Sequence, residues 1–332
     1  MASRHVSLTV VVALWASSSS SSPATFEARL RAAAPAGGWI GYAVAGVPGT
    51  RVCSGWCRGT APCRLQDDDN NLSDDGGRRD AAARPAAGEP LRIYLRLQDG
   101  IVKRVRLFSQ SCPLDTQGQS VAWLDDVTPP ESLAFMAQRV QSSGGEARDG
   151  ALVALAHHAD SGADKWLDGF VAPGGSRQLR EHAAFWLGHV RGRHGFDVLR
   201  GLLEDPDRNF REHVVFGISQ SPLPEAQDEL FRLARGAQDK DVRGKALFWL
   251  GQRAGQRAVD TLARAADEDP DVEVKRQAVF GLSQLPKEEG LPQLLRIART
   301  HREPEVRKAA LFWLGQSGDA RALALFEEIL IK

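Results

Sequence analysis

Hydrophobic positions in the second half of the chain recur with the spacing of an amphipathic helix. In the last copy of this pattern, Val306, Ala309, Ala310, Trp313 and Leu314 fall on one side of a helix. Similar text returns at a period of 31 or 32 residues. The pattern predicts a series of helices that each bury one face.

A basic residue marks one position of each copy, and a short motif follows it. The basic residues are Arg148, Arg180, Arg211, Arg243, Lys275 and Arg307. The motif reads Phe-Trp-Leu-Gly or Phe-Gly-Ile/Leu-Ser, and its five clear copies start at Phe185, Phe216, Phe248, Phe280 and Phe312. Four residues before the basic residue stands a helix-capping type, namely Ser176, Asp207, Asp239, Asp271 or Glu303. These signals predict where the first helix of each repeat begins.

A second apolar stripe follows the first in each copy. One position of it reads Leu199, Leu230, Leu262, Leu294 and Phe326. Two amphipathic helices per repeat can bury their apolar faces only by stacking on neighbouring repeats. We therefore expect a mainly α protein, with a solenoid of about six two-helix repeats over residues 146–332.

The preceding part of the chain alternates apolar and polar residues as a strand does. Such alternation runs from Leu91 to Leu97, and Asp99-Gly100 then supplies a tight hairpin turn. Residues 37–128 are therefore predicted to form a small β-rich region. Thr128 and Glu131 have the spacing of a capping box, which indicates a capping helix and linker over residues 129–145.

An acidic segment over residues 66–90 raises the question of calcium. Leu72 stands where an EF-hand loop needs Gly, and Arg78 stands where it needs a bidentate Glu. Because both defining residues are missing, we interpret the segment as a solvated loop.

The start of the chain has the order of a secretory signal peptide. Arg4 and His5 precede a mainly apolar run from Val6 to Ala16, and six serines follow. We assign residues 1–22 to this signal and expect export to the periplasm or out of the cell. The apolar run is too short to cross a bilayer as a helix, and no other segment reaches spanning length, so no membrane span is expected.

The four cysteines fit this compartment. They are Cys53, Cys57, Cys63 and Cys112. An even number of cysteines in an exported protein favours two disulfides, and three connectivities remain open. A four-thiolate metal site is the alternative, but the spacing matches no common zinc pattern, so no metal is expected.

The net charge and the absence of known catalytic motifs argue against two classes of function, nucleic-acid binding and catalysis. The chain has 42 Lys plus Arg and 42 Asp plus Glu among its 332 residues, so no net field favours nucleic acid. No nucleophile elbow, phosphate loop, dinucleotide fingerprint or zinc-protease helix appears. We therefore expect a protein that is not an enzyme and needs no cofactor.

The repeats resemble the short HEAT-like repeats of the phycobilisome-lyase type. The resemblance rests on Asp269-Pro270-Asp271 before Lys275, and on residues 303–310 leading to Leu314-Gly315. It implies protein binding, and it implies bonds between the acidic caps and the basic residues of neighbouring repeats. The leading interpretation is a non-enzymatic protein-binding scaffold in the cell envelope or outside the cell. The alternatives are a lyase-like component that grips a protein substrate and a structural module that self-associates.

Three arginines of the second helices offer a candidate binding row. Arg232, Arg264 and Arg296 share one repeat position opposite the leucine stripe, and Arg235 and Arg299 add charge one turn on. We predict that this row lies on the inner, concave surface. A solvated helix face is the alternative interpretation.

The aromatic positions of the first helices carry a separate expectation. Trp186, Trp249 and Trp313 alternate along the repeats with Gly217 and Gly281. We expect each tryptophan to be largely buried beside a glycine of the neighbouring repeat, and we expect the phenylalanine row to pack between repeats rather than form an exposed strip.

Overall fold

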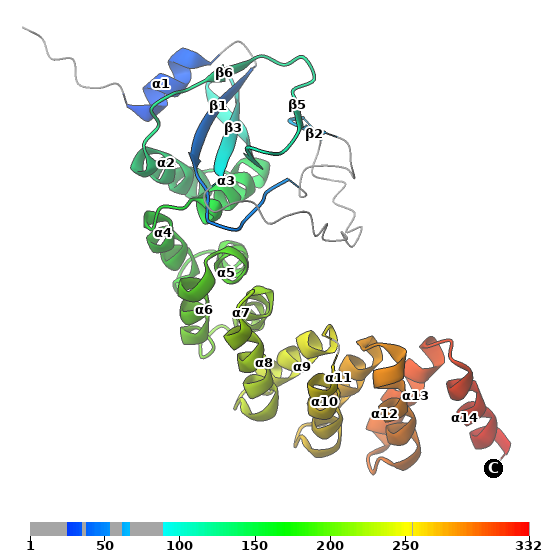
Figure 1. The fold of residues 1–332 in the computed structure, drawn as a ribbon. Helices are drawn as coiled ribbons and strands as arrows, with labels where there is room; N and C mark the ends of the chain where they lie inside the picture. The colour runs from blue at the N-terminus through cyan, green and yellow to red at the C-terminus, as the bar shows by residue number, and fades with distance from the viewer. Residues whose placement is uncertain (1–24, 35–37, 54–61, 67–88, 254, 332) are drawn as a thin grey trace, which may run out of the picture.

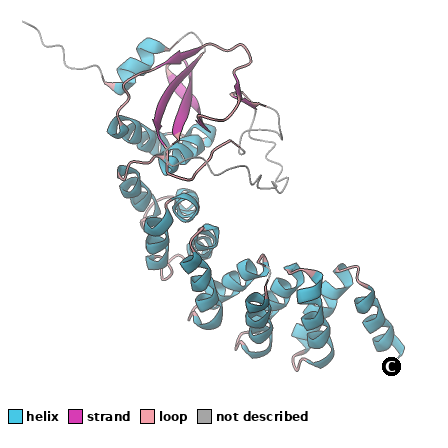
Figure 2. Cartoon of the chain, viewed as in Figure 1, coloured by secondary structure: helices cyan, strands magenta, loops and turns pink. Residues whose placement is uncertain are grey.

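The computed structural model describes residues 25–34, 38–53, 62–66, 89–253 and 255–331. A small β-sheet with covering helices comes first, and an arc of paired helices follows it (Figures 1 and 2). The chain is thus a helical solenoid with a small β-rich N-terminal region, as the sequence predicts. None of the described helices is long and apolar enough to span a membrane. The proposed signal peptide and most of the acidic loop lie outside the described residues.

The main sheet has four strands in the order β4-β3-β1-β6. Its strands are β1 (Trp39–Ala45), β3 (Pro90–Gln98), β4 (Ile101–Ser109) and β6 (Val121–Trp123). β3 pairs antiparallel with β1 and β4, and β6 joins β1 in parallel. The predicted hairpin turn is confirmed, since Asp99 and Gly100 join β3 to β4 with φ angles of 52° and 73°.

Each face of the sheet buries a different cluster. One face packs against α1 (Phe26–Ala33), α2 (Pro129–Ser142) and α3 (Gly145–His157). The other face buries Trp39, Tyr94 and Phe108 with two of the cysteines. Two short parallel strands lie on that side, β2 (Cys63–Arg64) and β5 (Leu114–Asp115).

A disulfide joins Cys53 to Cys112 on this second face. Cys63 is disulfide-bonded as well, whereas Cys57 lies outside the described residues. The Cys53–Cys112 bond ties the segment after β1 to the end of β4, which encloses the small cluster around Trp39.

From α3 onward, the described helices form six hairpins. They are α3–α4 (Gly162–Val171), α5 (Arg177–Val190)–α6 (Gly192–Gly201), α7 (Arg208–Gln220)–α8 (Pro224–Gly236), α9 (Lys240–Gly251)–α10 (Gln256–Glu268), α11 (Val272–Gln284)–α12 (Lys287–Thr300) and α13 (Pro304–Gln316)–α14 (Ala320–Ile331). The N-caps of α5, α7, α9, α11 and α13 are the five residues that the sequence predicts. Sequence signals alone were sufficient to place these helix starts.

The two helices of each repeat lie on opposite sides of the arc. Figure 1 shows α5, α7, α9, α11 and α13 on its inner side and α6, α8, α10, α12 and α14 on its outer side. We call the exposed surface of the first set the inner face and that of the second set the outer face. Successive first helices contact one another far more than successive second helices do.

Glycines account for this difference in spacing. A Cβ added to Gly188 would lie 1.9 Å from the carbonyl oxygen of Gly217, and one added to Gly251 would lie 2.6 Å from Cα of Gly281. The backbones of α5 and α7, and those of α9 and α11, therefore touch, as only glycine permits. Close spacing on one side and wider spacing on the other bends the stack toward the first helices.

Ion pairs link successive repeats at the helix starts. Arg180 binds Asp205, Arg211 binds Asp239, Arg243 binds Asp269 and Lys275 binds Glu303. Asp239 and Glu303 are the N-caps expected from the family resemblance, whereas Asp205 and Asp269 stand two residues before a cap. The inter-repeat bonding is therefore present, with two acidic positions in use instead of one.

The sheet and the solenoid share a helix and several backbone bonds. Helix α3 is the first helix of the first repeat and also packs on β4, where a Cβ on Gly150 would lie 2.2 Å from the Val105 oxygen. The Val47 amide donates to the His157 oxygen over 2.9 Å, and the Ala159 amide donates to the Ala45 oxygen over 2.8 Å. These contacts fix the β-rich region to the start of the arc.

Candidate binding surface on the inner face

Aromatic side chains form one continuous row along the inner face. Phe185 stacks on Phe216, which stacks on Trp249 at a ring separation of 4.8 Å. Phe248 continues the row to Phe280, and Phe280 meets Trp313 at 4.8 Å. We call the whole set the aromatic ladder, and its members are His157, Phe185, Trp186, His189, Phe216, Phe248, Trp249, Phe280, Phe312 and Trp313.

Helical geometry explains why the ladder is continuous. Phe and Trp of one motif are adjacent in sequence, so they lie about 100° apart on the same helix. Each tryptophan turns toward the preceding repeat, where Trp249 meets Phe216 and Trp313 meets Phe280. Repeats with one ring thus alternate with repeats that have two, and the first helices are close enough for their rings to touch.

The tryptophans pack against the core as expected, but their expected glycine neighbours were wrong. Trp186, Trp249 and Trp313 are partly buried, and their rings pack on aromatic side chains rather than beside a glycine. Gly217 and Gly281 instead face the backbone of the preceding first helix and a leucine of the second helix in that same preceding hairpin, Leu199 and Leu262 respectively. These glycines allow two helices to pack closely. The alternation of tryptophan and glycine in the sequence does not indicate this role.

The phenylalanine row does pack between repeats, yet it also remains accessible. Phe185, Phe216, Phe248 and Phe280 are half-buried, and Phe312 is 57% exposed. The row therefore packs between repeats and also forms a partly exposed strip, although the two were alternative expectations from the sequence. A contiguous row of half-exposed rings is the kind of apolar surface that marks an interaction site.

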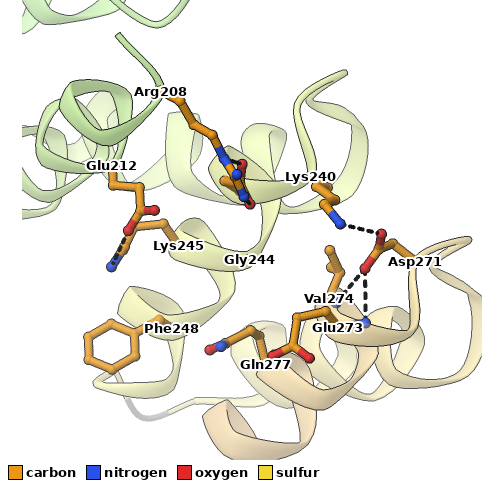
Figure 3. A pocket seen from close by; sticks show the side chains of 11 residues that line it. Arg208, Glu212, Lys240, Gly244, Lys245, Phe248, Asp271, Glu273, Val274 and Gln277 are labelled. Carbon is orange, nitrogen blue, oxygen red and sulfur yellow. Dashed lines mark hydrogen bonds and ion pairs between the residues drawn. The ribbon is translucent and has the colours of Figure 1, made fainter.

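A groove of about 180 Å³ opens beside the ladder over Gly244 (Figure 3). It lies between α7, α9 and α11, and Phe248 stands at its edge. The equivalent position is Glu in the preceding repeat and Arg in the following one. Gly244 leaves the space because it has no side chain there.

The charged groups around the groove are paired with one another. Lys245 lies 2.8 Å from Glu212, Lys240 lies 3.0 Å from Asp271, and Arg208 binds Asp241. Each pair crosses from one first helix or its cap to the next. The hydrogen bond from Lys240 lowers the pKa of the Asp271 carboxyl. The surface around the groove is thus polar, and each of these three cations is paired with a carboxylate.

Histidines at the start of the ladder are held neutral. Burial lowers the pKa of His157 to about 4, although its hydrogen bond to the Val153 oxygen favours the charged form. His158 is buried next to it, and its pKa is likewise lowered to about 4 by burial. In the described part of the chain, no three His, Cys, Asp or Glu side chains are grouped as a metal site.

The histidine and glutamine side chains near the ends of the first helices, at one repeat position, bond within their own helices or are exposed, and do not form a ladder between repeats. His157, Gln220 and Gln284 bond within their own helices, to Val153, Ser219 and Ser283. Gln252 and Gln316 are exposed. The row therefore keeps amide groups available along one side of the aromatic ladder.

The arginine row lies on the outer face, so its predicted concave position was wrong. It belongs to α8, α10 and α12, which form the wider side of the arc (Figure 1). Arg232 pairs with Glu229, Arg296 with Asp267 and Arg299 with Glu328. Arg235 donates to the Phe231 oxygen of its own helix, and Arg264 is exposed.

A second apolar surface lies on the last helix, α14. Leu323 is 60% exposed, Ile329 47% and Leu330 85%. An alternative function named above is a structural module that self-associates, and such a module would use an exposed apolar surface of this kind.

Comparison with known proteins identifies the repeat. A family model described as HEAT repeats matches residues 163–250, 228–300 and 259–332, which together cover about half of the chain. No curated protein matches the sequence significantly.

Several solved structures share the helical architecture at low similarity. The CpcE–CpcF complex of phycocyanin lyase from Nostoc is 20% identical with a TM-score of 0.35, over 46% of this chain and 99% of that one. Human deoxyhypusine hydroxylase is 18% identical with a TM-score of 0.27, over 60% of this chain and 78% of that one. An engineered protein is 17% identical with a TM-score of 0.30, over 54% of this chain and 93% of that one. Likenesses of this size say nothing about what the chain does.

Proposed function

The chain belongs to the HEAT-repeat family, and from that premise we propose that it is a non-enzymatic scaffold that binds another protein along its inner face. The observation that carries the proposal is the aromatic ladder, which runs without interruption from α3 to α13. Solenoids of stacked repeats commonly bind partners on an extended concave surface. A row of rings that stays half-exposed supplies the apolar anchors of such an interface.

Two further features support placing this scaffold in the cell envelope or outside the cell. The first 22 residues have the order of an export signal. The Cys53–Cys112 disulfide is the kind of bond that persists in an oxidising compartment. Together, the signal-like sequence and the disulfide support our proposal that the protein is exported.

A site-specific crosslink tests the binding surface. A photoreactive benzoylphenylalanine replaces Phe312, which is exposed at the end of the ladder, and the same residue replaces the exposed Arg264 on the outer face as the control. We expect one recurrent partner protein to crosslink from position 312 and not from position 264. The partner is then purified, and we expect Phe216→Ala to weaken its binding at least tenfold. Capture from both positions alike, or from neither, would remove the inner face as the binding surface.

A further inference from the structure

The aromatic ladder has a spacing that matches one kind of extended chain. Glycine contacts bring α5 and α7, and likewise α9 and α11, to the short end of the usual helix spacing of roughly 8–10 Å. A polyproline II helix rises about 3.1 Å per residue with three residues per turn, so it repeats every 9 Å or so. One residue in every three would therefore come level with the next repeat along the ladder, where repeats with one ring alternate with repeats that have two.

Uncharged hydrogen-bond donors flank the rings, and the one ammonium group against a ring among the described contacts, that of Lys245 at 5.7 Å from the Phe248 ring centre, is paired with Glu212. Among the described residues, no acceptor bonds the indole N–H of Trp186 or Trp313, and the exposed Gln252 and Gln316 add amide groups. A polyproline II segment presents free carbonyl oxygens because it has no internal hydrogen bonds, and proline brings no N–H that would need an acceptor. The surface offers donors without charge, and such a segment offers acceptors without charge.

Charge complementarity points the same way. The cations at the central groove already pair with carboxylates on the neighbouring helix, as in Lys245–Glu212 and Lys240–Asp271. A charged segment would have to break such pairs before it could form its own, whereas an uncharged segment leaves them intact. The groove over Gly244 then gives the segment an anchor beside Phe248.

We propose that the inner face binds an uncharged, proline-rich segment of the partner protein in the polyproline II conformation. Its rings pack on the aromatic ladder, and its carbonyl oxygens accept from the indole and glutamine N–H groups beside it. This inference rests on the proposed function, since it names the chemistry of the partner at the same surface. Aromatic-lined grooves recognise such segments at a low cost in chain entropy, because the conformation is largely formed before binding.

A labelled dodecaproline peptide tests the inference by fluorescence anisotropy. Its length of about 37 Å covers four repeats. The matched control is an equally long, uncharged Gly-Ser peptide, which lacks the conformation. We expect dodecaproline to bind at least tenfold more tightly than the Gly-Ser peptide and than a Pro-Pro-Glu repeat of equal length. Equal affinity for dodecaproline and the Gly-Ser peptide would overturn the inference.

Three variants locate the binding. Phe248→Ala removes a ladder ring and is expected to weaken dodecaproline binding at least tenfold. Gly244→Gln fills the groove and is expected to weaken it several-fold; its Cβ would lie 3.5 Å from Gln277, so the fold tolerates it. Trp166→Ala removes an exposed ring of α4, outside the ladder, and should change nothing. Unchanged binding by both Phe248→Ala and Gly244→Gln would overturn the inference.

The crosslink from position 312 separates the two proposals. If it captures a partner while dodecaproline fails to bind, the scaffold function stands and the proline-rich segment is wrong. If dodecaproline binds the ladder and no partner crosslinks, the ligand chemistry stands and the scaffold function is wrong.

Discussion

The first and second helices of the repeats are built from similar amphipathic patterns, yet they form opposite surfaces. Alternate pairs of first helices, α5–α7 and α9–α11, touch through glycine backbones, and the first helices carry a stacked aromatic row. Neighbouring second helices lie farther apart and carry arginines paired with acidic residues. The first helices contact one another more closely than the second helices do, and the glycine contacts of α5–α7 and α9–α11 contribute to this difference, which puts the first helices on the inside of the arc.

Ion pairs also differ between the two sets of helices: a pair that links the first helices is buried, and a pair between second helices is exposed. The inter-repeat pair Arg180–Asp205 is buried, with 6% and 2% of the side chains exposed, and its guanidinium lies 3.8 Å from the ring centre of Phe210. The outer pair Arg296–Asp267 is about 40% exposed on both sides. Buried pairs are costly to break, whereas exposed pairs contribute little.

The largest expected effect follows from this contrast. Asp205→Ala should lower the free energy of unfolding by about 3–5 kcal/mol, because it leaves the Arg180 charge buried without its partner. Asp267→Ala on the outer face is the matched control and should cost about 1 kcal/mol or less. Denaturant unfolding of both variants measures the difference, and similar costs would contradict the assignment of the inner pairs as structural links.

Glycine substitutions test the cause of the curvature. Gly188→Ala should cost about 1–3 kcal/mol, because its Cβ would meet the Gly217 carbonyl. Gly169→Ala in the second helix α4 should instead stabilise by about 0.5–1 kcal/mol, since no atom lies within 4 Å of the added Cβ. Thermal unfolding compares the two. A Gly188→Ala protein as stable as the parent would show that the helices do not depend on backbone contact.

Acid should weaken the start of the inner layer. His157 is neutral in the fold with a pKa of about 4, so the unfolded chain binds a proton first as the pH falls below 6.5. Its contribution to stability is present above pH 6.5 and is lost between pH 6.5 and 4. At pH 5.5 the loss relative to pH 8 is about 1.4 kcal/mol.

His157→Gln isolates this effect, because four other repeats have glutamine at the same position. We expect the variant to lose less stability than the parent between pH 8 and pH 5.5, as measured by urea unfolding at both values. An identical loss in parent and variant would assign the acid sensitivity to another group.

The smallest effect is expected on the outer face. Replacing Arg264 and Arg296 together with Ala should lower the stability by about 1 kcal/mol or less, because these side chains are exposed or half-exposed. Arg232 is kept in this variant, because it bonds the buried Glu229 carboxylate. Binding of the crosslinked partner should stay within twofold of the parent. A larger loss of affinity, with unchanged circular dichroism, would move the binding surface to the arginine row.

Much of the fold could be predicted because its signals are local. Helix starts depend on a capping residue and the next turn, so Asp207, Asp239 and Asp271 were enough to locate α7, α9 and α11. The hairpin at Asp99-Gly100 is equally local. The candidate surface was harder to predict, since the sequence displayed the phenylalanine row but not how far it is buried.

By itself the sequence determined the repeat, its two helices, the capping residues and the small sheet, because each of these follows from periodicity or from neighbours along the chain. Only the tertiary structure decided which helices line the inside of the arc. Contacts such as Gly188 with Gly217 and Phe216 with Trp249 join residues about one repeat apart, and their closeness sets the curvature. That curvature puts the aromatic ladder on the inner face and the arginines on the outer face.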